Sequence, residues 1–300
     1  ASPGMDETRA VLLLCFLLPA SFCLVSMRRV QTISRHLPTR GAVSHIKTVL
    51  PKTFYRASRG FRRMGCIQGR SFSKAASTNG HVLADSWTKN DDLSKTLKFW
   101  FSDSYMGGLR EIENKDYIQA QFKVWWESGA EVDKKIKDDF GSLILAVGEG
   151  KESGEGWETK EGYLARIILL DQLSRNAFRG MPEAFKFDEK AVALTKEAYR
   201  MGYMKEYQFS ELQFATMPLM HSEDIKDHDL LSSIWESAVI AEDMKEFKDR
   251  TVDFALEHRK VIEKFGRYPH RNKLYGREST EEEIKWLSGD EVPMWAKSQG

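Results

Sequence analysis

The sequence predicts an all-α fold built from antiparallel helical hairpins. Apolar residues recur at three- and four-residue spacing over several long segments, with charged residues between them. No segment alternates apolar and polar residues as a half-buried strand does, and only four prolines follow residue 73. Helical segments that follow one another after short breaks favour hairpins stacked side by side.

Two kinds of sequence make up the chain, and they meet near residue 84. Residues 27–84 contain 12 Lys or Arg and no Asp or Glu, whereas residues 85–300 contain 32 Lys or Arg against 42 Asp or Glu, a formal net charge of −10. All eight tryptophans lie in the second part. The three cysteines, Cys15, Cys23 and Cys66, lie in the first. We expect a targeting leader over residues 1–72 and one helical domain over residues 73–300, with its core at 91–288.

The leader has the composition of an organellar transit peptide, because it is rich in Arg and hydroxyl residues and poor in acidic ones. The segment "RSFSKA", residues 70–75, resembles a mitochondrial processing site with a cut near Phe72–Ser73. A basic, disordered arm that binds nucleic acid is the alternative interpretation of this segment. The mitochondrial matrix is the expected location.

An apolar run over residues 10–26 has the size of a signal-peptide core and is short for a spanning helix, which needs roughly 20 residues. If translation begins at Met5, this run is a signal segment before a transit peptide at 27–72, as in proteins of complex plastids. If translation begins at Met27, the mitochondrion is favoured. A plastid therefore remains the alternative location.

Apolar stripes and stop signals place the helices of the domain. In order along the chain, helices are expected at Asp92–Phe101, Lys115–Ser128, Ala130–Gly150, Leu164–Phe178, Glu189–Met201, Ser210–Met220, Leu230–Ala241, Met244–Phe265 and Thr280–Leu287. Gly148 and Gly150 supply the stop of the third. The fourth is apolar over a wide arc, as expected of a central buried helix. Thr280 and Glu283 open the last with a capping box.

The composition of the domain excludes several kinds of site. Residues 73–300 contain no cysteine, so disulfides, thiolate metal sites and Cys nucleophiles are excluded there. The acidic net charge argues against non-specific nucleic-acid binding, which requires neutralisation of phosphates. We also expect no membrane span in this domain and no cofactor.

The first polar motif is "DQLSRNAFRG", residues 171–180. Asp171 and Arg175 lie four residues apart, so they share one face of a helix. The adjacent ridge carries Gln172, Asn176 and Arg179. Arg binds carboxylate or phosphate through a planar fork, and Asp171 would hold Arg175 in the required rotamer. An internal ion pair that ties this helix to its neighbour is the alternative.

The second motif is "PLMHSEDIKDHD", residues 218–229. Its polar residues are His221, Glu223, Asp224, Asp227, His228 and Asp229. Such a group can supply a general base or hold a divalent metal, but its spacing matches no diagnostic zinc arrangement, and we expect no metal site. Asp and Ser here also suit the cap of a helix expected to begin near Leu230. His258, on an apolar stripe, is expected to be a hydrogen-bonded core residue.

The third motif is "FGRYPHRNKLYGREST", residues 265–280. Gly266 is expected to end a helix, and Pro269 biases the residue before it away from helix. This accounts for the glycines and the proline as loop residues. The polar residues without a structural explanation are Arg267, His270, Arg271, Asn272 and Arg277.

Together with "LKFWF" near residue 100, these motifs resemble the bacterial family catalogued as domain of unknown function 924, in the right order over about Leu93 to Leu287. The resemblance implies an all-helical fold similar to tetratricopeptide-repeat proteins, without their regular repeat. It brings no reaction, substrate or catalytic residue. The family's recurring polar positions fall on Asp171, Gln172, Arg175, Asn176, Arg179, His221, Glu223, Asp224, Arg267, Pro269, His270, Arg271, Asn272 and Arg277.

Two functions remain open. The favoured one is a binding module that grips a protein, a peptide or an anionic ligand, with no assigned catalytic residue. The alternative is an enzyme or small-molecule binder in which the three motifs converge on one pocket, where Arg residues hold a phosphorylated or carboxylated substrate and His221 or His270 moves protons. Convergence of Arg175, His221 and Arg271 in space would favour the small-molecule site.

Overall fold

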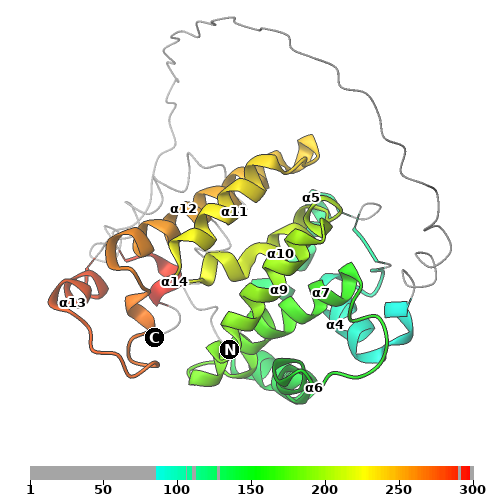
Figure 1. Ribbon diagram of the computed structural model, residues 1–300, viewed down its shortest axis with the longest axis horizontal. Helices are drawn as coiled ribbons and strands as arrows, with labels where there is room; N and C mark the ends of the chain where they lie inside the picture. The colour runs from blue at the N-terminus through cyan, green and yellow to red at the C-terminus, as the bar shows by residue number, and fades with distance from the viewer. Residues whose placement is uncertain (1–85, 106, 110–112, 127–128, 290–291, 298–300) are drawn as a thin grey trace, which may run out of the picture.

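The computed structural model describes residues 86–105, 107–109, 113–126, 129–289 and 292–297 (Figure 1). These residues form helices joined by turns and contain no strand, which confirms the all-α fold. None of the described helices combines the length and the apolar character needed to cross a bilayer. The predicted leader, residues 1–72, and the proposed cut near Phe72–Ser73 lie outside the described residues.

The element bounds follow the sequence patterns closely. The α-helices are α4 (Asp91–Phe101), α5 (Lys115–Trp126), α6 (Ala130–Glu149), α7 (Lys160–Ile167), α8 (Ser174–Ala177), α9 (Asp188–Arg200), α10 (Phe209–His221), α11 (Ile225–Ser237), α12 (Lys245–Phe265), α13 (Glu281–Leu287) and α14 (Met294–Lys297). A π-helical segment, η2 (Ile168–Leu173), joins α7 to α8. The 3₁₀ turns are η1 (Ser86–Lys89), η3 (Pro182–Phe185), η4 (Tyr203–Lys205), η5 (Glu242–Met244) and η6 (Pro269–Arg271).

The central element is the continuous helix formed by α7, η2 and α8. It begins where the Thr159 hydroxyl accepts a hydrogen bond of 3.1 Å from the amide of Gly162. Every residue of 161–175 is buried, so the wide apolar arc of the sequence reflects contact on all sides. The sequence predicted an ordinary helix here. The structure instead widens the middle turn, and π-helical turns of this kind occur frequently at functional sites.

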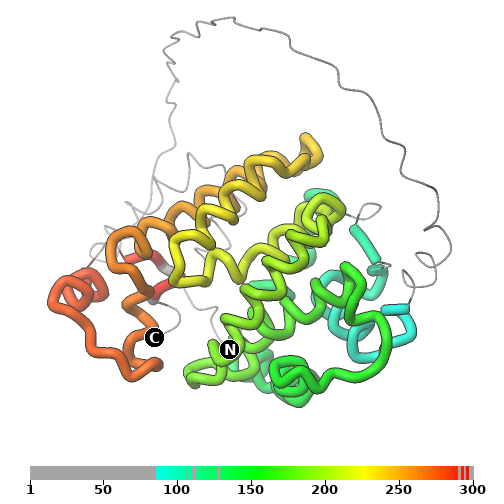
Figure 2. The backbone as a smooth tube through the Cα atoms, viewed as in Figure 1, coloured from blue at the N-terminus to red at the C-terminus, as the bar shows by residue number. Residues whose placement is uncertain are grey.

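Helices α4, α6, α9 and α10 surround this central helix (Figure 1). One apolar cluster connects them, with Trp100, Phe140 and Phe214 among its largest fully buried side chains. Helices α11 and α12 form a long antiparallel pair that continues from α10, shown in yellow and orange (Figure 2).

A second, smaller apolar cluster lies at the C-terminal side, where Val261, Ile262 and Tyr268 are buried together. The partly buried side chains packed on it are Ile225, Phe265, Trp286 and Trp295. This cluster fixes the loop after α12 against the junction between α10 and α11. The third sequence motif is thereby brought next to the second.

Several helix boundaries differ from the prediction, such as the start of α7 at Lys160 rather than Leu164, and two of the differences have a local reason. Helix α11 begins at Ile225, five residues before the predicted Leu230. Asp224 caps it, because its carboxylate accepts a hydrogen bond of 2.9 Å from the amide of Lys226. Gly148 was predicted to help end α6, but it lies inside the helix. Only Gly150, left-handed with φ +69°, ends it.

Candidate functional site

The site is centred on Asp171, a fully buried carboxylate in the π-helical segment η2. The His221 ring nitrogen Nδ1 lies 2.7 Å from Asp171 Oδ1, and Arg175 Nη1 lies 3.1 Å from the same oxygen. The side-chain amide of Gln172 donates to the other carboxylate oxygen. One carboxylate therefore joins the first sequence motif to the second, because His221 is the last residue of α10.

Arg175 is held on both edges of its guanidinium group. Its Nη1 donates to the Asp171 backbone carbonyl at 2.5 Å, and its Nη2 donates to Asp188 Oδ2 at 3.0 Å. The Phe185 ring lies 5.3 Å from the guanidinium carbon. These contacts fix the planar fork of Arg175 in one orientation.

Arg271 brings the third motif to the same place. Its Nη1 donates to the backbone carbonyl of His221 at 3.0 Å and lies 3.5 Å from Asp188 Oδ2. Its guanidinium carbon lies 4.6 Å from the centre of the Tyr268 ring and 5.0 Å from that of Phe185. Three segments far apart in the sequence thus meet, and we call Asp171, Arg175, Asp188, His221 and Arg271 the Arg–His cluster.

Electrostatics set the protonation states of this cluster. Burial opposes ionisation of Asp171, but Arg175 and His221 outweigh it and hold the pKa of the carboxyl well below its usual value. Burial lowers the pKa of His221, with a smaller contribution from Arg175, and the opposing effect of Asp171 does not restore it. An ionised Asp171 can only accept, so neutral His221 donates from Nδ1 and keeps its lone pair on Nε2.

Several polar atoms of the cluster have no hydrogen-bond partner among the described residues. Asp188 Oδ1 and Arg271 Nε are buried and unpartnered. Arg271 donates its hydrogen bond to the His221 carbonyl from Nη1. His221 bonds Asp171 through Nδ1, and its Nε2 takes no part in that bond. Buried polar groups normally find partners, so unpartnered ones gathered at one place mark a candidate ligand site.

Comparisons with known proteins agree with the sequence motifs. The family model described as "Bacterial protein of unknown function (DUF924)" matches residues 96–291, which is more than half of the chain. The chain belongs to the DUF924 family. The predicted family is thus confirmed, and the Arg–His cluster lies inside the matched residues.

The chain is also similar to a solved structure, that of a protein of unknown function from Agrobacterium tumefaciens. It is 27% identical to this chain with a TM-score of 0.51, and the match covers 65% of this chain and 96% of that one. No curated protein matches the chain.

Two further motif residues of this DUF924 protein support the cluster from one side. Arg277 donates to both oxygens of Glu223, at 2.6 and 3.0 Å, and the amide of Tyr268 donates to the same carboxylate at 2.9 Å. The Tyr268 hydroxyl donates to the carbonyl of Met220 at 2.5 Å. These bonds fasten the loop that carries Arg271 to the end of α10.

His270 lies next to this support and is held neutral. Its ring centre lies 5.5 Å from that of Tyr268 and 5.5 Å from that of Trp295. Burial, followed by the nearby charge of Arg271, lowers the pKa of His270 to about 3. The predicted core histidine, His258, is confirmed: it is buried, and its Nδ1 donates to the carbonyl of Phe254 at 2.9 Å.

The remaining candidate residues lie elsewhere. Arg267 Nε donates to Glu283 Oε1 at 2.7 Å and Asn272 Nδ2 donates to Glu283 Oε2 at 3.2 Å, and both bonds hold the start of α13. Asp224 caps α11. Asn176 and Arg179 turn away from Asp171 and bond Asp133 of α6, at 3.0 and 2.7 Å.

The Asp133 contacts border a shallow, open hollow of about 430 Å³. Its other lining residues are Gly129, Ala130, Lys134, Lys137 and Ala177. Asp133 neutralises the charge of Arg179 at this hollow. None of the lining residues belongs to the Arg–His cluster.

Two residues of the site were missed by sequence reasoning. Asp188 pairs with Arg175 and Arg271, and the Phe185 ring contacts the guanidinium groups of the same two arginines. Neither Asp188 nor Phe185 belongs to one of the three polar motifs. Asp188 is the first residue of α9, where an acidic residue is common in any helix. The sequence could have indicated Phe185 and Asp188 only by their position shortly after the first motif.

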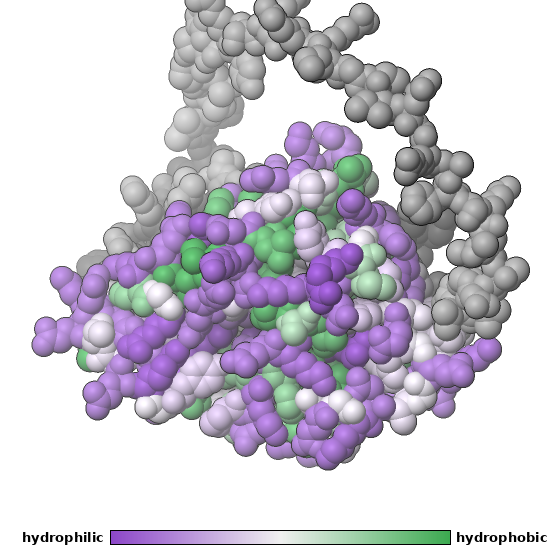
Figure 3. Space-filling model, in the orientation of Figure 1, coloured by the Kyte–Doolittle hydropathy of each residue, from purple (hydrophilic) through white to green (hydrophobic). Residues whose placement is uncertain are grey.

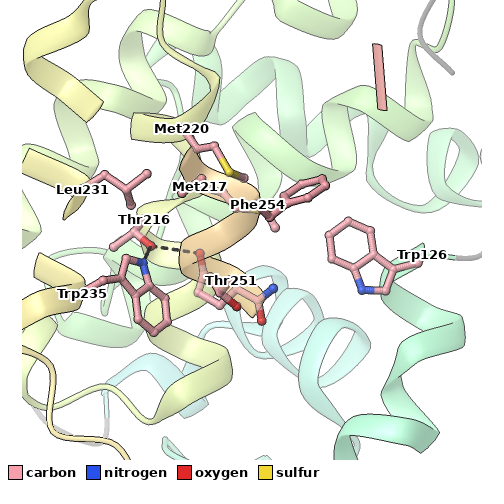
Figure 4. A pocket seen from close by; sticks show the side chains of 10 residues that line it. Trp126, Thr216, Met217, Met220, Leu231, Trp235, Thr251 and Phe254 are labelled. Carbon is pink, nitrogen blue, oxygen red and sulfur yellow. Dashed lines mark hydrogen bonds between the residues drawn. The ribbon is translucent and has the colours of Figure 1, made fainter. Parts of the chain in front are cut away.

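An apolar hollow lies between α5, α10, α11 and α12 (Figure 4). Its lining includes Trp126, Met217, Trp235 and Phe254. Figure 3 shows patches of hydrophobic side chains near the middle of the face that it draws, separated by hydrophilic ones. The free space of the hollow is about 10 Å³, enough for about one water molecule, so the side chains nearly fill it.

The described residues contain no group of three or more His, Asp or Glu arranged to hold a metal ion. In the second motif, His228 Nε2 donates to the carbonyl of Ser222 at 3.0 Å, and Asp227 accepts from the Ser222 hydroxyl at 2.7 Å. These residues close the turn between α10 and α11.

Proposed function

We propose that this DUF924 protein binds a small anionic molecule, a carboxylate or a phosphate, at the Arg–His cluster. The observation that carries the proposal is the convergence of three separate motifs on Asp171 and Arg271, with Arg271 Nε left without a hydrogen-bond partner among the described residues. Planar guanidinium groups suit carboxylate and phosphate, and a buried position strengthens such contacts.

The two arginines of the cluster have different roles in this proposal. Arg175 bonds Asp171 through Nη1 and Asp188 through Nη2 and serves to hold the site together. Arg271 Nη1 lies 3.5 Å from Asp188, beyond the 3.0 Å of the Arg175 contact, and its guanidinium group lies over the Tyr268 and Phe185 rings. We therefore infer that Arg271 is the principal contact to the anion.

A thermal-shift screen of the full chain against phosphate, phosphate esters and carboxylates tests this function, because a ligand that binds only the folded state raises its melting temperature. We expect hits that are lost in Arg271→Ala. The matched control is Arg179→Ala, which removes an arginine whose partner, Asp133, lies outside the cluster. A hit that survives Arg271→Ala, or that is lost equally in Arg179→Ala, would overturn the assignment.

Binding of a protein or peptide receives less support. The hollow beside Trp126 has room for about one water molecule and would have to open before it accepted a side chain. The similarity to tetratricopeptide-repeat proteins stays a prediction. Affinity capture with the full chain tests the protein-partner alternative, which fails if no partner is recovered reproducibly.

A further inference from the structure

We infer that the ligand of the Arg–His cluster carries a hydroxyl group close to its anionic group, and that His221 Nε2 accepts the hydrogen bond of that hydroxyl. This inference rests on the proposed anion site and names the chemical class of its ligand. The candidate ligands are hydroxycarboxylates and phosphate esters that bear a free hydroxyl.

The first step is the tautomer of His221. Asp171 is fully buried and ionised, and its Oδ1 lies 2.7 Å from His221 Nδ1. A carboxylate without a proton can only accept, so the hydrogen of neutral His221 is on Nδ1. Asp171 thereby acts as a positioning residue that leaves a lone pair on Nε2, as second groups do for many functional histidines.

The second step is that Nε2 is free to use this lone pair. Neither of the nearby arginines donates to it: Arg175 bonds Asp171 and Asp188, and Arg271 bonds the backbone carbonyl of His221. No described residue donates to Nε2, and 16% of the His221 side chain remains exposed. His221 Nε2 is thus a free acceptor close to Arg271, which the carbonyl of the same His221 holds in place.

The third step is complementarity. A ligand at this place meets donors on Arg271 and an acceptor on His221, so it needs both an anionic oxygen and a hydrogen-bond donor. A plain carboxylate would direct only lone pairs toward His221 Nε2 and leave that acceptor unpaired. Sites built to bond a hydroxyl discriminate strongly against analogues that lack it, because buried polar groups then lose their partner.

The test compares ligand pairs that differ by one hydroxyl, measured by calorimetric titration of the full chain. The pairs are malate with succinate and glycerol 3-phosphate with propyl phosphate. We expect the hydroxyl-bearing member of at least one pair to bind about tenfold more tightly, a difference of about 1.4 kcal/mol.

The informative variant is His221→Asn. The Asn amide stands where Nδ1 does and still donates to Asp171, but no atom replaces Nε2. We expect this variant to weaken binding of the hydroxyl-bearing member of each pair more than that of its partner, so that the two affinities become equal. Equal affinities within both pairs in the wild type, or a preference that persists in His221→Asn, would overturn the inference while leaving anion binding in place.

Two further outcomes are decisive. If none of the four probes binds the wild type, the proposed anion site fails and the inference fails with it. Nitrogen-15 spectra of the His221 ring give an independent measurement that needs no ligand. A proton on Nδ1 is expected, and the opposite tautomer would contradict the assigned role of Nε2 even if an anion binds.

Discussion

At the scale of single residues, Asp171 is the one on which the cluster depends. Isolated buried charges are costly, and a fully buried carboxylate persists only when it is paired and hydrogen-bonded. Asp171 has three side-chain partners, from Gln172, Arg175 and His221. It therefore fixes a guanidinium and an imidazole with one group, and removal of its charge leaves Arg175 with Asp188 as its remaining counter-ion.

We expect Asp171→Asn to lower the free energy of unfolding by about 3–5 kcal/mol, because it breaks a buried ion pair and leaves one partner charged. Urea denaturation of the full chain measures the change. The control is Asp138→Asn, which removes an exposed pair with Lys134 on α6 and should cost no more than about 0.5 kcal/mol. Similar losses in the two variants would show that Asp171 is not the hub of the cluster.

His270 makes the stability of the folded chain depend on pH. Burial and Arg271 lower the pKa of His270 to about 3, whereas the same residue in the unfolded chain takes up a proton below about pH 6.5. The folded state thus binds fewer protons than the unfolded state between these values. The contribution of His270 is fully present above about pH 6.5 and is lost as the pH falls toward the folded pKa.

We expect wild type to lose about 1.4 kcal/mol of stability per pH unit below about pH 6.5, relative to His270→Gln. The difference between the two proteins isolates this residue from the buried carboxylates, whose raised pKa values act in the opposite direction, as for Glu211 with a pKa of about 7. Urea denaturation at several pH values measures it. A difference that is independent of pH would show that His270 titrates normally in the folded chain.

At the scale of elements, α6 packs on Phe187, the residue before α9, through a glycine. A side-chain carbon at Gly148 would meet the Phe187 ring at 2.3 Å, so the absent side chain is what lets the ring approach the helix. Gly141 in the same helix has only an ordinary contact of 3.6 Å, to the Lys137 side chain. The two positions therefore separate packing from helix propensity.

We expect Gly148→Ala to destabilise the fold by about 1–3 kcal/mol through overpacking, and Gly141→Ala to stabilise it by about 0.5–1 kcal/mol through helix propensity. Thermal and urea denaturation give the signs. Combining Gly148→Ala with Phe187→Leu should recover part of the loss. If Gly148→Ala were as stabilising as Gly141→Ala, the close approach of Phe187 would be wrong.

At the scale of the whole molecule, the sequence predicted the all-α fold and most helix positions because apolar stripes report directly on burial. The sequence left the convergence of Arg175, His221 and Arg271 as one of two alternatives, because residues of these motifs could also form ion pairs and caps within their own helices. It could not predict that Asn176 and Arg179 point elsewhere. Successive side chains on a helix point about 100° apart, so Asn176 faces α6 although its neighbour Arg175 faces the cluster.

The contacts of Asp188 and the π-helical segment also required tertiary structure. An acidic residue at the first position of a helix has a sufficient local reason to be there, so its contact with two arginines leaves no separate mark in the sequence. The widened turn at Asp171 depends on how α6, α9 and α10 pack around it. Both are consequences of packing between segments far apart in the chain.

The charge division between residues 27–84 and 85–300 leads to the last prediction, that the leader is removed in an organelle. We expect the full chain, expressed with a C-terminal tag, to reach the mitochondrial matrix and to begin near Ser73 when its mature N-terminus is sequenced. Arg70→Ala should block or shift this cut, whereas Arg62→Ala, eight residues earlier and equally basic, should not. Accumulation in a plastid would favour the bipartite leader that starts at Met5. An uncut chain outside both organelles would contradict the transit peptide and return the basic segment to its alternative, an arm that binds nucleic acid.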